Sequence, residues 1–346
     1  MFFMAFSILS SMKGMDIKMK KDIYYNVYYG KLYENTEHGK LEKFEVKSEY
    51  GRIEHIFIKR EIEMDTERKY YDIVTPYGYG GPIITECNDK EKLLAQFEKN
   101  FTEYCTENNI VSEFIRFHPI FENALDFKGI YDVVYSRHTV GTNLKDYDDP
   151  VQAEFSKSLR REIRKAEKNG VTVRTILEPK DLLAFKKLYE ETMDRNEADA
   201  YYYFPDSYYE YIIKYLGKSV LEIQLIYENE IIASEMYFIE GDLMHAHLLG
   251  SSQKMLDLDA GALLEATAAR WGHDHGYRYI HHGGGRTSAE DDSLYTYKKK
   301  YGKNTEFDFY VGKKIWDREK YDELVAKREG ELNHKIDSDY FPKYRA

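Results

Sequence analysis

The order of the predicted elements between Val171 and Val311 constrains this chain more than any other feature. A strand-like run is followed by two helices, three strand-like runs with no helix between them, a helix, a short strand, a helical turn and a last strand. Three consecutive strands form an antiparallel meander, whereas a strand–helix–strand unit gives a parallel crossover. Such a sheet is parallel in only one place, where neighbouring strands can part and leave a slot for a ligand. The predicted elements are Val171–Ile176, Pro179–Asn196, Pro205–Leu216, Val220–Tyr227, Ile231–Ile239, Leu243–Leu249, Asp259–His275, Tyr279–His282, Leu294–Tyr301 and Phe307–Val311.

The first half of the chain repeats part of this order. Three strand-like runs precede a helix, and a strand, a short helix and a long strand follow it. The polar stretch Asp146–Asp149 marks a boundary. We therefore expect a mixed α/β fold with two tandem domains, over residues 21–148 and 149–346, and two separate sheets, over residues 40–145 and 171–311. The predicted elements of the first half are Phe44–Tyr50, Arg52–Lys59, Tyr70–Thr75, Asp89–Asn108, Val111–Phe117, Pro119–Leu125 and Tyr131–Thr142.

Composition restricts the class of protein. The 346 residues are enough for about two domains, and 42% hydrophobic with 32% charged residues is typical of a globular protein in water. A net charge of −11 argues against DNA or an anionic membrane as the partner of the whole surface. Cys87 and Cys105 have no metal-binding spacing and predict no disulfide, which favours a cytoplasmic location. The 33 tyrosines either line clefts or reflect a biased codon pool.

An apolar run, MFFMAFSILSSM, opens the chain. It is too short to span a bilayer, which needs about 20 residues, and no basic segment precedes it. Residues 1–20 are interpreted as a leader from an over-extended start site or as an apolar arm, with a membrane-touching segment as the alternative. They are excluded from the fold argument.

A short basic helix, SLRREIRKAEKNGV, spans Ser158–Val171. Arg160, Arg164 and Lys168 fall on one face at four-residue spacing. Arginine binds phosphate through a bidentate fork, so Arg160 and Arg164 are candidates for a phosphate site on donor or acceptor. The alternative is a solvated face.

The next candidates lie where a long helix is expected to end, in LYEETMDRNEADAYYYF. Arg195, Asn196, Tyr202 and Tyr203 stand at this junction of helix and loop, a frequent position for functional groups. We interpret the first three as ligand-binding and Tyr203 as a candidate for proton transfer. Packing of the tyrosines in the corner between two helices is the alternative.

Four histidines flank the predicted slot. His245 and His247 alternate onto one face of a strand, and His281 and His282 end the adjacent strand. A neutral histidine with a pKa near 6.5 can act as a general base on an amine, so His247 and His282 are candidate catalytic residues. No carboxylate or thiol stands beside them at ligand spacing, and we expect no metal.

Several glycines and lysines complete the candidate site. Backbone amides near Gly250 are placed to polarise a carbonyl, and Gly284 lies in a glycine triplet that permits close approach to a ligand. Gly261 stands at the start of a helix for which Asp259 is a plausible cap, and free amides at such an end favour an anion. Lys298 belongs to a group of four lysines with no acid among them, which is either a binding site for a polyanion or an exposed basic face.

These residues resemble the Fem-type branch of the GNAT acyltransferase superfamily, which includes aminoacyl transferases of peptidoglycan synthesis. The resemblance implies two tandem GNAT-like domains with the active cleft in the second, and an N-acyltransferase that modifies an amine of a cell-wall or amino-sugar precursor. It further implies acyl-CoA or aminoacyl-tRNA as donor substrate, no tightly bound cofactor, and a monomer or dimer. Tyr297–Lys298 is similar to the aromatic–lysine pair of Fem enzymes. The matching pieces are YDIVTPYGYGGP, FHP, RREIRKAEKNGV, LYEETMDRNEADAYYYF, HAHLLGSS, HHGGGR and LYTYKKKYG.

The chain also departs from the family pattern. The GNAT donor loop usually reads Q/R-x-x-G-x-G/A, whereas Ser251–Gly261 reads SSQKMLDLDAG. The chain also lacks the 50-residue heptad-like run that the helical arm of many Fem-type enzymes needs. The donor is therefore left undetermined. The alternative function is a non-catalytic glycan-binding or cell-wall-precursor-binding protein derived from such an enzyme.

Overall fold

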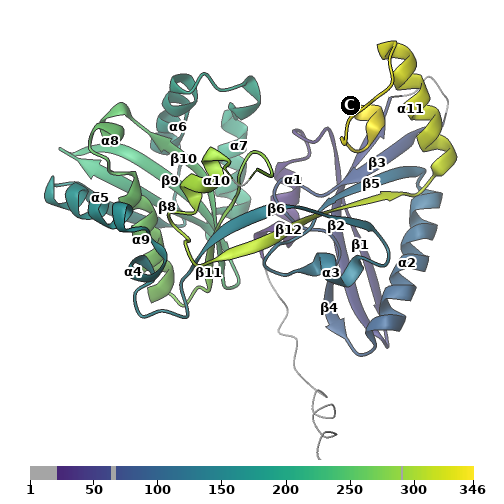
Figure 1. Cartoon of the computed structure of the whole chain (residues 1–346), viewed down its shortest axis with the longest axis horizontal. Helices are drawn as coiled ribbons and strands as arrows, with labels where there is room; N and C mark the ends of the chain where they lie inside the picture. The colour runs from purple at the N-terminus through teal and green to yellow at the C-terminus, as the bar shows by residue number, and fades with distance from the viewer. Residues whose placement is uncertain (1–21, 64–67, 290) are drawn as a thin grey trace, which may run out of the picture.

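The computed structural model describes residues 22–63, 68–289 and 291–346 (Figure 1). The apolar run at residues 1–20 lies outside these ranges. Among the described residues, no helix is long and apolar enough to cross a membrane. The strands are β1 (Gly39–Ser48), β2 (Gly51–Ile62), β3 (Tyr70–Val74), β4 (Ile83–Cys87), β5 (Ile110–Arg116), β6 (Asp132–Asn143), β7 (Thr172–Leu177), β8 (Val220–Tyr227), β9 (Glu230–Glu240), β10 (Leu243–Ser251), β11 (Tyr279–Gly284) and β12 (Glu306–Ile315).

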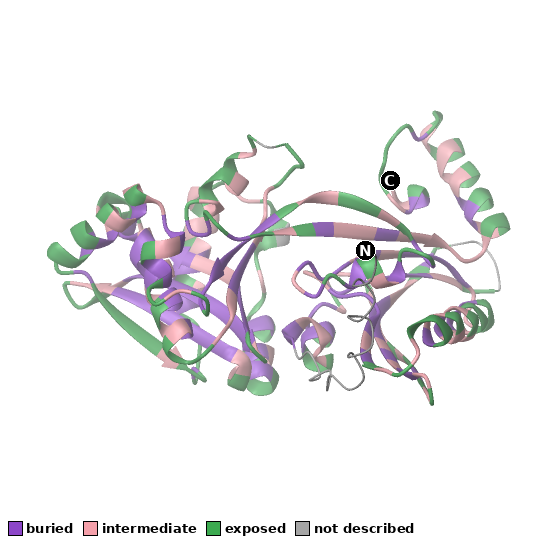
Figure 2. Cartoon of the chain, turned by 60° about the horizontal axis from the view of Figure 1, so that its bottom comes forward, coloured by how far each residue is buried: buried purple, intermediate pink, exposed green. Residues whose placement is uncertain are grey.

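Helices cover both faces of the sheet in the second half. Helices α6 and α7 pack on one face, together with α1, and α5 and α9 pack on the other. Figure 2 shows that the strands between these layers are largely buried. The helices are α1 (Val27–Leu32), α2 (Lys90–Glu107), α3 (Asn123–Phe127), α4 (Pro150–Glu154), α5 (Lys157–Lys168), α6 (Leu183–Arg195), α7 (Asp206–Tyr211), α8 (Gln253–Asp257), α9 (Gly261–Asp274), α10 (Ser293–Lys298) and α11 (Arg318–Leu332).

The strands form one continuous sheet in the order β1-β2-β3-β5-β12-β6-β11-β10-β9-β8-β7, with β4 paired to β2. Two contacts are parallel, β3 with β5 and β10 with β11, and the other pairings are antiparallel. The predicted mixed α/β class is therefore confirmed, and the two halves repeat the same strand order.

The prediction of two separate sheets is wrong, because β6 and β12 are shared between the halves. Strand β6 comes from the first half but pairs with β11 of the second, while β12 comes from the second half and pairs with β5 of the first. The two strands also pair with each other and run across the middle of the molecule (Figure 1). Each half thus completes its sheet with a strand of the other.

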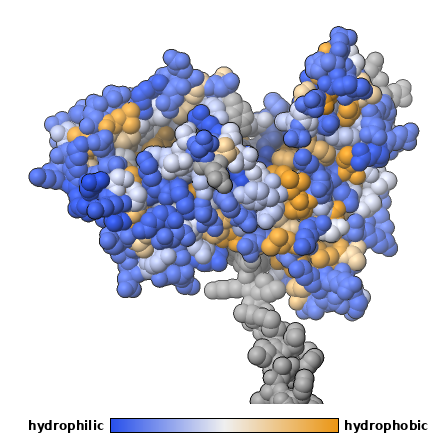
Figure 3. Space-filling model, in the orientation of Figure 1, coloured by the Kyte–Doolittle hydropathy of each residue, from blue (hydrophilic) through white to orange (hydrophobic). Residues whose placement is uncertain are grey.

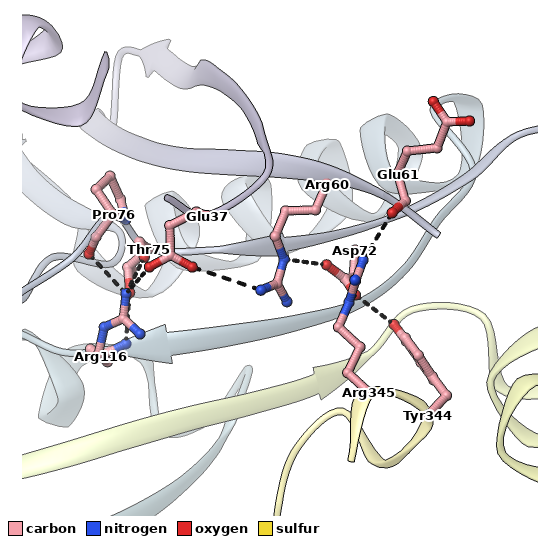
Figure 4. Close-up of polar contacts among 9 residues, drawn as sticks. All are labelled: Glu37, Arg60, Glu61, Asp72, Thr75, Pro76, Arg116, Tyr344 and Arg345. Carbon is pink, nitrogen blue, oxygen red and sulfur yellow. Dashed lines mark hydrogen bonds and ion pairs between the residues drawn. The ribbon is translucent and has the colours of Figure 1, made fainter. Parts of the chain in front are cut away.

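The C-terminal segment packs on the first half. Asp72 of β3 accepts hydrogen bonds from Arg60 Nε at 2.7 Å, Arg345 Nε at 2.5 Å and Tyr344 Oη at 3.2 Å (Figure 4). Helix α11 contributes Tyr321 and Leu324 to a small core under the same sheet. The boundary at residues 148 and 149 stays a prediction.

Helix α9 begins later than predicted. Its first residue is Gly261, and Asp259 has a left-handed backbone with φ of 50°. The Asp259 carboxylate forms an ion pair with Lys165 of α5 at 2.6 Å instead of capping the helix. The expected cap is therefore wrong, and the first turn of α9 has no side-chain cap.

Candidate active site

Strands β10 and β11 part soon after they meet. They pair in register only from Leu243 and Tyr279 to His245 and His281. Beyond that point β10 continues along β9 to Ser251, and β11 continues along β6. A bulge in β10 between Ala246 and Leu248 adds to the separation. The structure thus contains the parting of strands that the strand order predicts, and the region between β10 and β11 is called the slot below.

A buried polar group lies on the α9 side of this slot. His282 Nδ1 is 3.6 Å from Glu265 Oε2, and its Nε2 is 2.8 Å from Thr142 Oγ1. The Thr142 hydroxyl donates to the carbonyl of Tyr301, so it accepts the proton of His282 Nε2. The lone pair on His282 Nδ1 therefore faces Glu265. Tyr237 of β9 donates to Glu265 Oε2 at 3.3 Å.

Lys298 reaches the same site from α10. Its ammonium donates to the carbonyl of Gly284 at 2.9 Å, at the end of β11. Asp292 caps α10 by accepting the amide of Tyr295 at 2.9 Å and also accepts the amide of Thr287 at 2.9 Å. These backbone donors lower the pKa of Asp292 to about 2. The cap therefore stays ionised and fixes the helix that carries Lys298.

The pKa values of Glu265 and Lys298 are both shifted toward pH 7. Burial raises the pKa of Glu265 to about 7, against the opposing effects of the Tyr237 hydrogen bond and the charge of Lys298. Burial lowers the pKa of Lys298 to about 8. Burial and then the neighbouring Glu265 raise the pKa of Glu235 well above its usual range. Two groups that titrate near pH 7 at one site are typical of proton transfer.

The four histidines do not form one cluster. The rings of His245 and His281 lie 5.6 Å apart on the face that carries α6, whereas His282 points to the α9 face. His247, at the bulge, contacts Tyr208 Oη at 2.8 Å. Burial lowers the pKa of both His247 and His282 to about 3. A base of this strength holds a proton poorly at neutral pH, so Glu265 fits the role of general base better.

The other candidates on α6 and the loop that follows serve the fold in this structure. Arg195 donates to the carbonyl of Ser251 at 3.0 Å and to its hydroxyl at 2.9 Å, which fixes the end of β10. Asn196 is the exposed C-terminal cap of α6. The carbonyl of Tyr202 accepts a hydrogen bond from the buried Tyr189.

Tyr203 makes an exposed contact on the same loop. Its hydroxyl donates to Asp194 at 2.7 Å, and this bond raises the pKa of Tyr203 above its usual value. A tyrosine whose pKa is raised is a weaker acid than a free one and forms its basic phenolate less readily. Its candidate role in proton transfer stays a prediction.

The two arginines of α5 differ. Arg160 donates to the backbone carbonyls of Phe155 and Gln152, which end the preceding helix α4. Arg164 is exposed on α5. Arg164 is therefore free to face an anion in solution, whereas the guanidinium of Arg160 is already used.

The three candidate glycines have different surroundings. At Gly250 a side chain would collide with the backbone of α6 at Leu188 and Tyr189, so this glycine permits close helix packing. At Gly284 a Cβ would lie 3.1 Å from the carbonyl of His138. Gly261 has open space around it, with only Met255 Sδ at 3.5 Å.

Sequence reasoning missed Glu265, Glu235 and Tyr237. One signal was present, because Glu265 is the only acid between Gly261 and Arg270 in an otherwise apolar helix. A buried carboxylate in such a stripe needs a partner. Nothing in the sequence places Glu235 beside it, because that contact depends on the packing of α9 on β9.

Larger hollows lie away from the slot. Cavities of about 690 and 1230 Å³ flank α11 on the first half. The first is lined by hydrophobic Val325 and Phe341 together with charged residues such as Lys313. Figure 3 shows hydrophobic residues gathered on the first half, at the right of the view. Neither cavity contains the groups that titrate near neutrality, so the slot remains the better candidate for chemistry.

A known protein family matches the part of the chain that contains this site. Residues 153–299 match the model of the family described as Acetyltransferase (GNAT) domain. The match includes Glu265, His282 and Lys298. The second half therefore contains a GNAT acetyltransferase domain, and the resemblance stated from the sequence is confirmed.

Solved structures extend the likeness to most of the chain. FemX superposes with a TM-score of 0.66 at 13% identity, covering 87% of this chain and 94% of FemX. L-PGS from Bacillus licheniformis superposes with a TM-score of 0.53 at 15% identity, covering 78% of this chain and 83% of that one. The C-terminal domain of a putative lysylphosphatidylglycerol synthetase from Agrobacterium fabrum gives 0.52 at 12% identity, covering 78% and 84%. The chain thus has the fold of the Fem-type branch of the GNAT superfamily. No curated protein sequence matches the chain.

Proposed function

We propose that this protein is an N-acyltransferase that moves an acyl or aminoacyl group to an amine in the slot between β10 and β11. The observation that carries the proposal is the pair Glu265 and Lys298 beside the parted strands, whose pKa values of about 7 and about 8 lie at neutral pH and just above it. The GNAT domain at residues 153–299 supports the reaction class.

The geometry assigns a role to each group. An amine enters as the ammonium ion and gives a proton to the Glu265 carboxylate. The free amine then attacks the carbonyl carbon of a thioester or ester donor, and the carbonyl oxygen becomes an oxyanion. The Lys298 ammonium and the backbone amides of β10 near Gly250 stabilise this oxyanion. As the intermediate collapses, its nitrogen releases its second proton to solvent and the amide forms. The departing thiolate or alkoxide takes the proton from Glu265.

The acceptor is proposed to be an amine of a cell-wall or amino-sugar precursor. FemX, L-PGS and the C-terminal domain of a putative lysylphosphatidylglycerol synthetase share the fold at low identity. The name of the last of these associates that protein with an aminoacyl group on a phospholipid. The donor is proposed to be acyl-CoA or charged tRNA. The free cysteines Cys87 and Cys105 fit a cytoplasmic location.

The test is a donor and acceptor screen with purified protein. Acyl-CoAs and aminoacyl-tRNAs are offered with amino sugars and peptidoglycan precursors, and mass spectrometry records a new amide. Glu265→Gln serves as the control, because it keeps the size of the side chain and removes the base. The proposal predicts an amide with the wild type and at most a trace with the variant. Amide formed equally by both proteins would contradict the assigned base.

One observation favours a second candidate, a protein that binds a precursor without modifying it. The segment where GNAT enzymes carry a glycine-rich donor loop contains helix α8 here. The same screen separates the candidates, because ligand at 100 times its Kd should add about 2.7 kcal/mol to stability. Thermal stabilisation by a precursor, with no amide from any donor, would support the binding protein.

A further inference from the structure

A buried carboxylate lies between the two halves on the face of the sheet opposite Glu265. Asp22 is 2% exposed and caps the short helix Ile23–Tyr25 by accepting the amide of Tyr24 at 2.9 Å. Its Oδ2 accepts a hydrogen bond from His245 Nε2 of β10 at 2.6 Å. Its Oδ1 lies 3.5 Å from Nε2 of His118, which follows β5. One side chain of the N-terminal segment therefore contacts both halves.

The contact with β10 falls at the apex of the slot. His245 is the last residue of β10 that pairs with β11, and its partner in register is His281. The ring of Tyr24 packs edge-on against His245 at 4.6 Å and against Tyr79 at 5.5 Å. Tyr79 in turn contacts His281 at 5.1 Å. Both strands are thus held by one aromatic group where they part.

The hydrogen bonds show that His118 and His245 are donors and that Asp22 is their acceptor. Asp22, His118 and His245 are close enough to hold a metal ion. However, the amide of Phe121 donates to His118 Nδ1 at 3.2 Å, so the neutral ring carries its proton on Nε2, toward Asp22. A histidine that ligates a metal donates through its other nitrogen, which is the reverse of this arrangement. The separation of 2.6 Å between Asp22 and His245 is the length of a charge-assisted hydrogen bond.

We propose that Asp22 is a positioning residue of the slot, because its carboxylate fixes the ring of His245 and so sets the point at which β10 and β11 part. The effect on catalysis rests on the proposed function, whereas the effect on strand geometry does not. In Asp22→Asn the side chain keeps one acceptor oxygen, so one of the two buried donors, His245 Nε2–H or His118 Nε2–H, faces an amide NH2 instead of an acceptor. An unpaired buried donor favours movement of the apex.

The first half offers a matched control. His55 Nε2 contacts Glu113 Oε1 at 2.6 Å, and both side chains are as buried as Asp22 and His245. This pair lies on β2 and β5, away from the slot. Glu113→Gln therefore removes a histidine–carboxylate bond of the same length without touching β10 or β11.

The experiment compares Asp22→Asn, Asp22→Glu and Glu113→Gln by amide hydrogen exchange and by histidine ring NMR. Asp22→Asn is expected to speed exchange at residues 243–246 and 279–284 by about tenfold and to shift the His245 ring resonances. Asp22→Glu keeps the charge and is expected to restore most of both signals. Glu113→Gln is expected to change His55 and Trp316, whose indole nitrogen also donates to Glu113 at 3.2 Å, and to leave the slot amides as in the wild type.

Kinetics add a readout that a purely structural role would not change. Once acyl transfer is measured, Asp22→Asn is expected to lower kcat by about 10- to 100-fold with little change in the donor KM. Equal changes in slot exchange for Asp22→Asn and Glu113→Gln would show a general loss of stability and overturn the proposal. Stoichiometric zinc that survives dialysis against a chelator would overturn it in favour of a metal site. If the wild type forms no amide, the proposed function fails, while the exchange and NMR results still decide the role of Asp22.

Discussion

The two halves of the molecule each contain one pair of parallel strands at the same place in the strand order. The pair in the first half stays together, whereas the pair in the second half parts. In the first half β3 and β5 pair from Tyr71 to Val74, and the contact continues beyond the strands. The amide of Thr75 donates to the carbonyl of Phe114, and the amide of Gly80 donates to the carbonyl of Arg116 at 2.7 Å. In the second half, pairing between β10 and β11 stops at His245 and His281.

Arg116 accounts for much of this difference. One nitrogen of its guanidinium donates to the carbonyls of Thr75 at 2.6 Å and Pro76 at 3.0 Å and contacts Glu37 at 3.2 Å (Figure 4). The arginine thus occupies the place where the first pair of strands would open. The comparison shows that a repeated strand order creates only the opportunity for a slot, and that side chains decide which slot stays open.

The largest expected effect tests whether amide formation takes place at the slot of the second half. Lys298→Met should lower kcat/KM for amide formation by about 100- to 1000-fold, because the variant loses the ammonium that we propose stabilises the oxyanion. Steady-state kinetics give the measurement. Lys300→Met is the control, because Lys300 is exposed beside the same helix. Similar rates for Lys298→Met and the wild type would remove the main reason to place the reaction at the slot.

A second prediction concerns the pH profile of the open slot. The rate should rise as Glu265 loses its proton near pH 7 and fall as Lys298 loses its own near pH 8, which gives a narrow bell. Glu265→Gln should lower the rate by about 100-fold and abolish the rising limb. A rate that keeps the same rising limb in the variant would show that another group is the base.

The same carboxyl should also make stability depend on pH. Its pKa is raised in the folded protein from 4.5 to about 7, so its contribution to stability is fully present below pH 4.5 and is lost as pH rises through 7. Glu265→Gln should therefore be more stable than the wild type at pH 8 by about 1–3 kcal/mol and show no such gain at pH 4. Urea unfolding at both pH values gives the comparison, and an equal difference at each would contradict the raised pKa.

The smallest expected effect tests whether Arg116 holds β3 and β5 of the first half together. Arg116→Met should cost about 1–2 kcal/mol, because the carbonyls of Thr75 and Pro76 lose their donor, and should leave kcat unchanged. Arg195→Met is the counterpart in the second half, since Arg195 fixes Ser251 at the end of β10. Denaturant unfolding and kinetics of both variants sharpen the comparison. Loss of activity in Arg116→Met would mean that the first half also contributes to catalysis.

Local sequence patterns were sufficient for most of the secondary structure. Alternation and helical spacing placed the three-strand meander and α9, and the element order predicted both the mixed α/β class and a single parting of strands in the second half. The sequence also singled out Lys298, His282 and Gly284 as candidates, because charge and glycine content mark them locally. These features depend on neighbours within a few residues, which the sequence shows directly.

Contacts between distant segments were decided only by the tertiary structure. No pattern in β6 or β12 shows that each completes the sheet of the other half, because a strand's partner depends on the whole topology. Glu265 and Glu235 are 30 positions apart, yet burial in one site raises the pKa of both. The low pKa of His247 and His282 has the same origin, since desolvation depends on what surrounds a side chain in space. Asp22 bonds to His245, 223 positions away, for the same reason: the energy of a buried polar group is set by its three-dimensional surroundings.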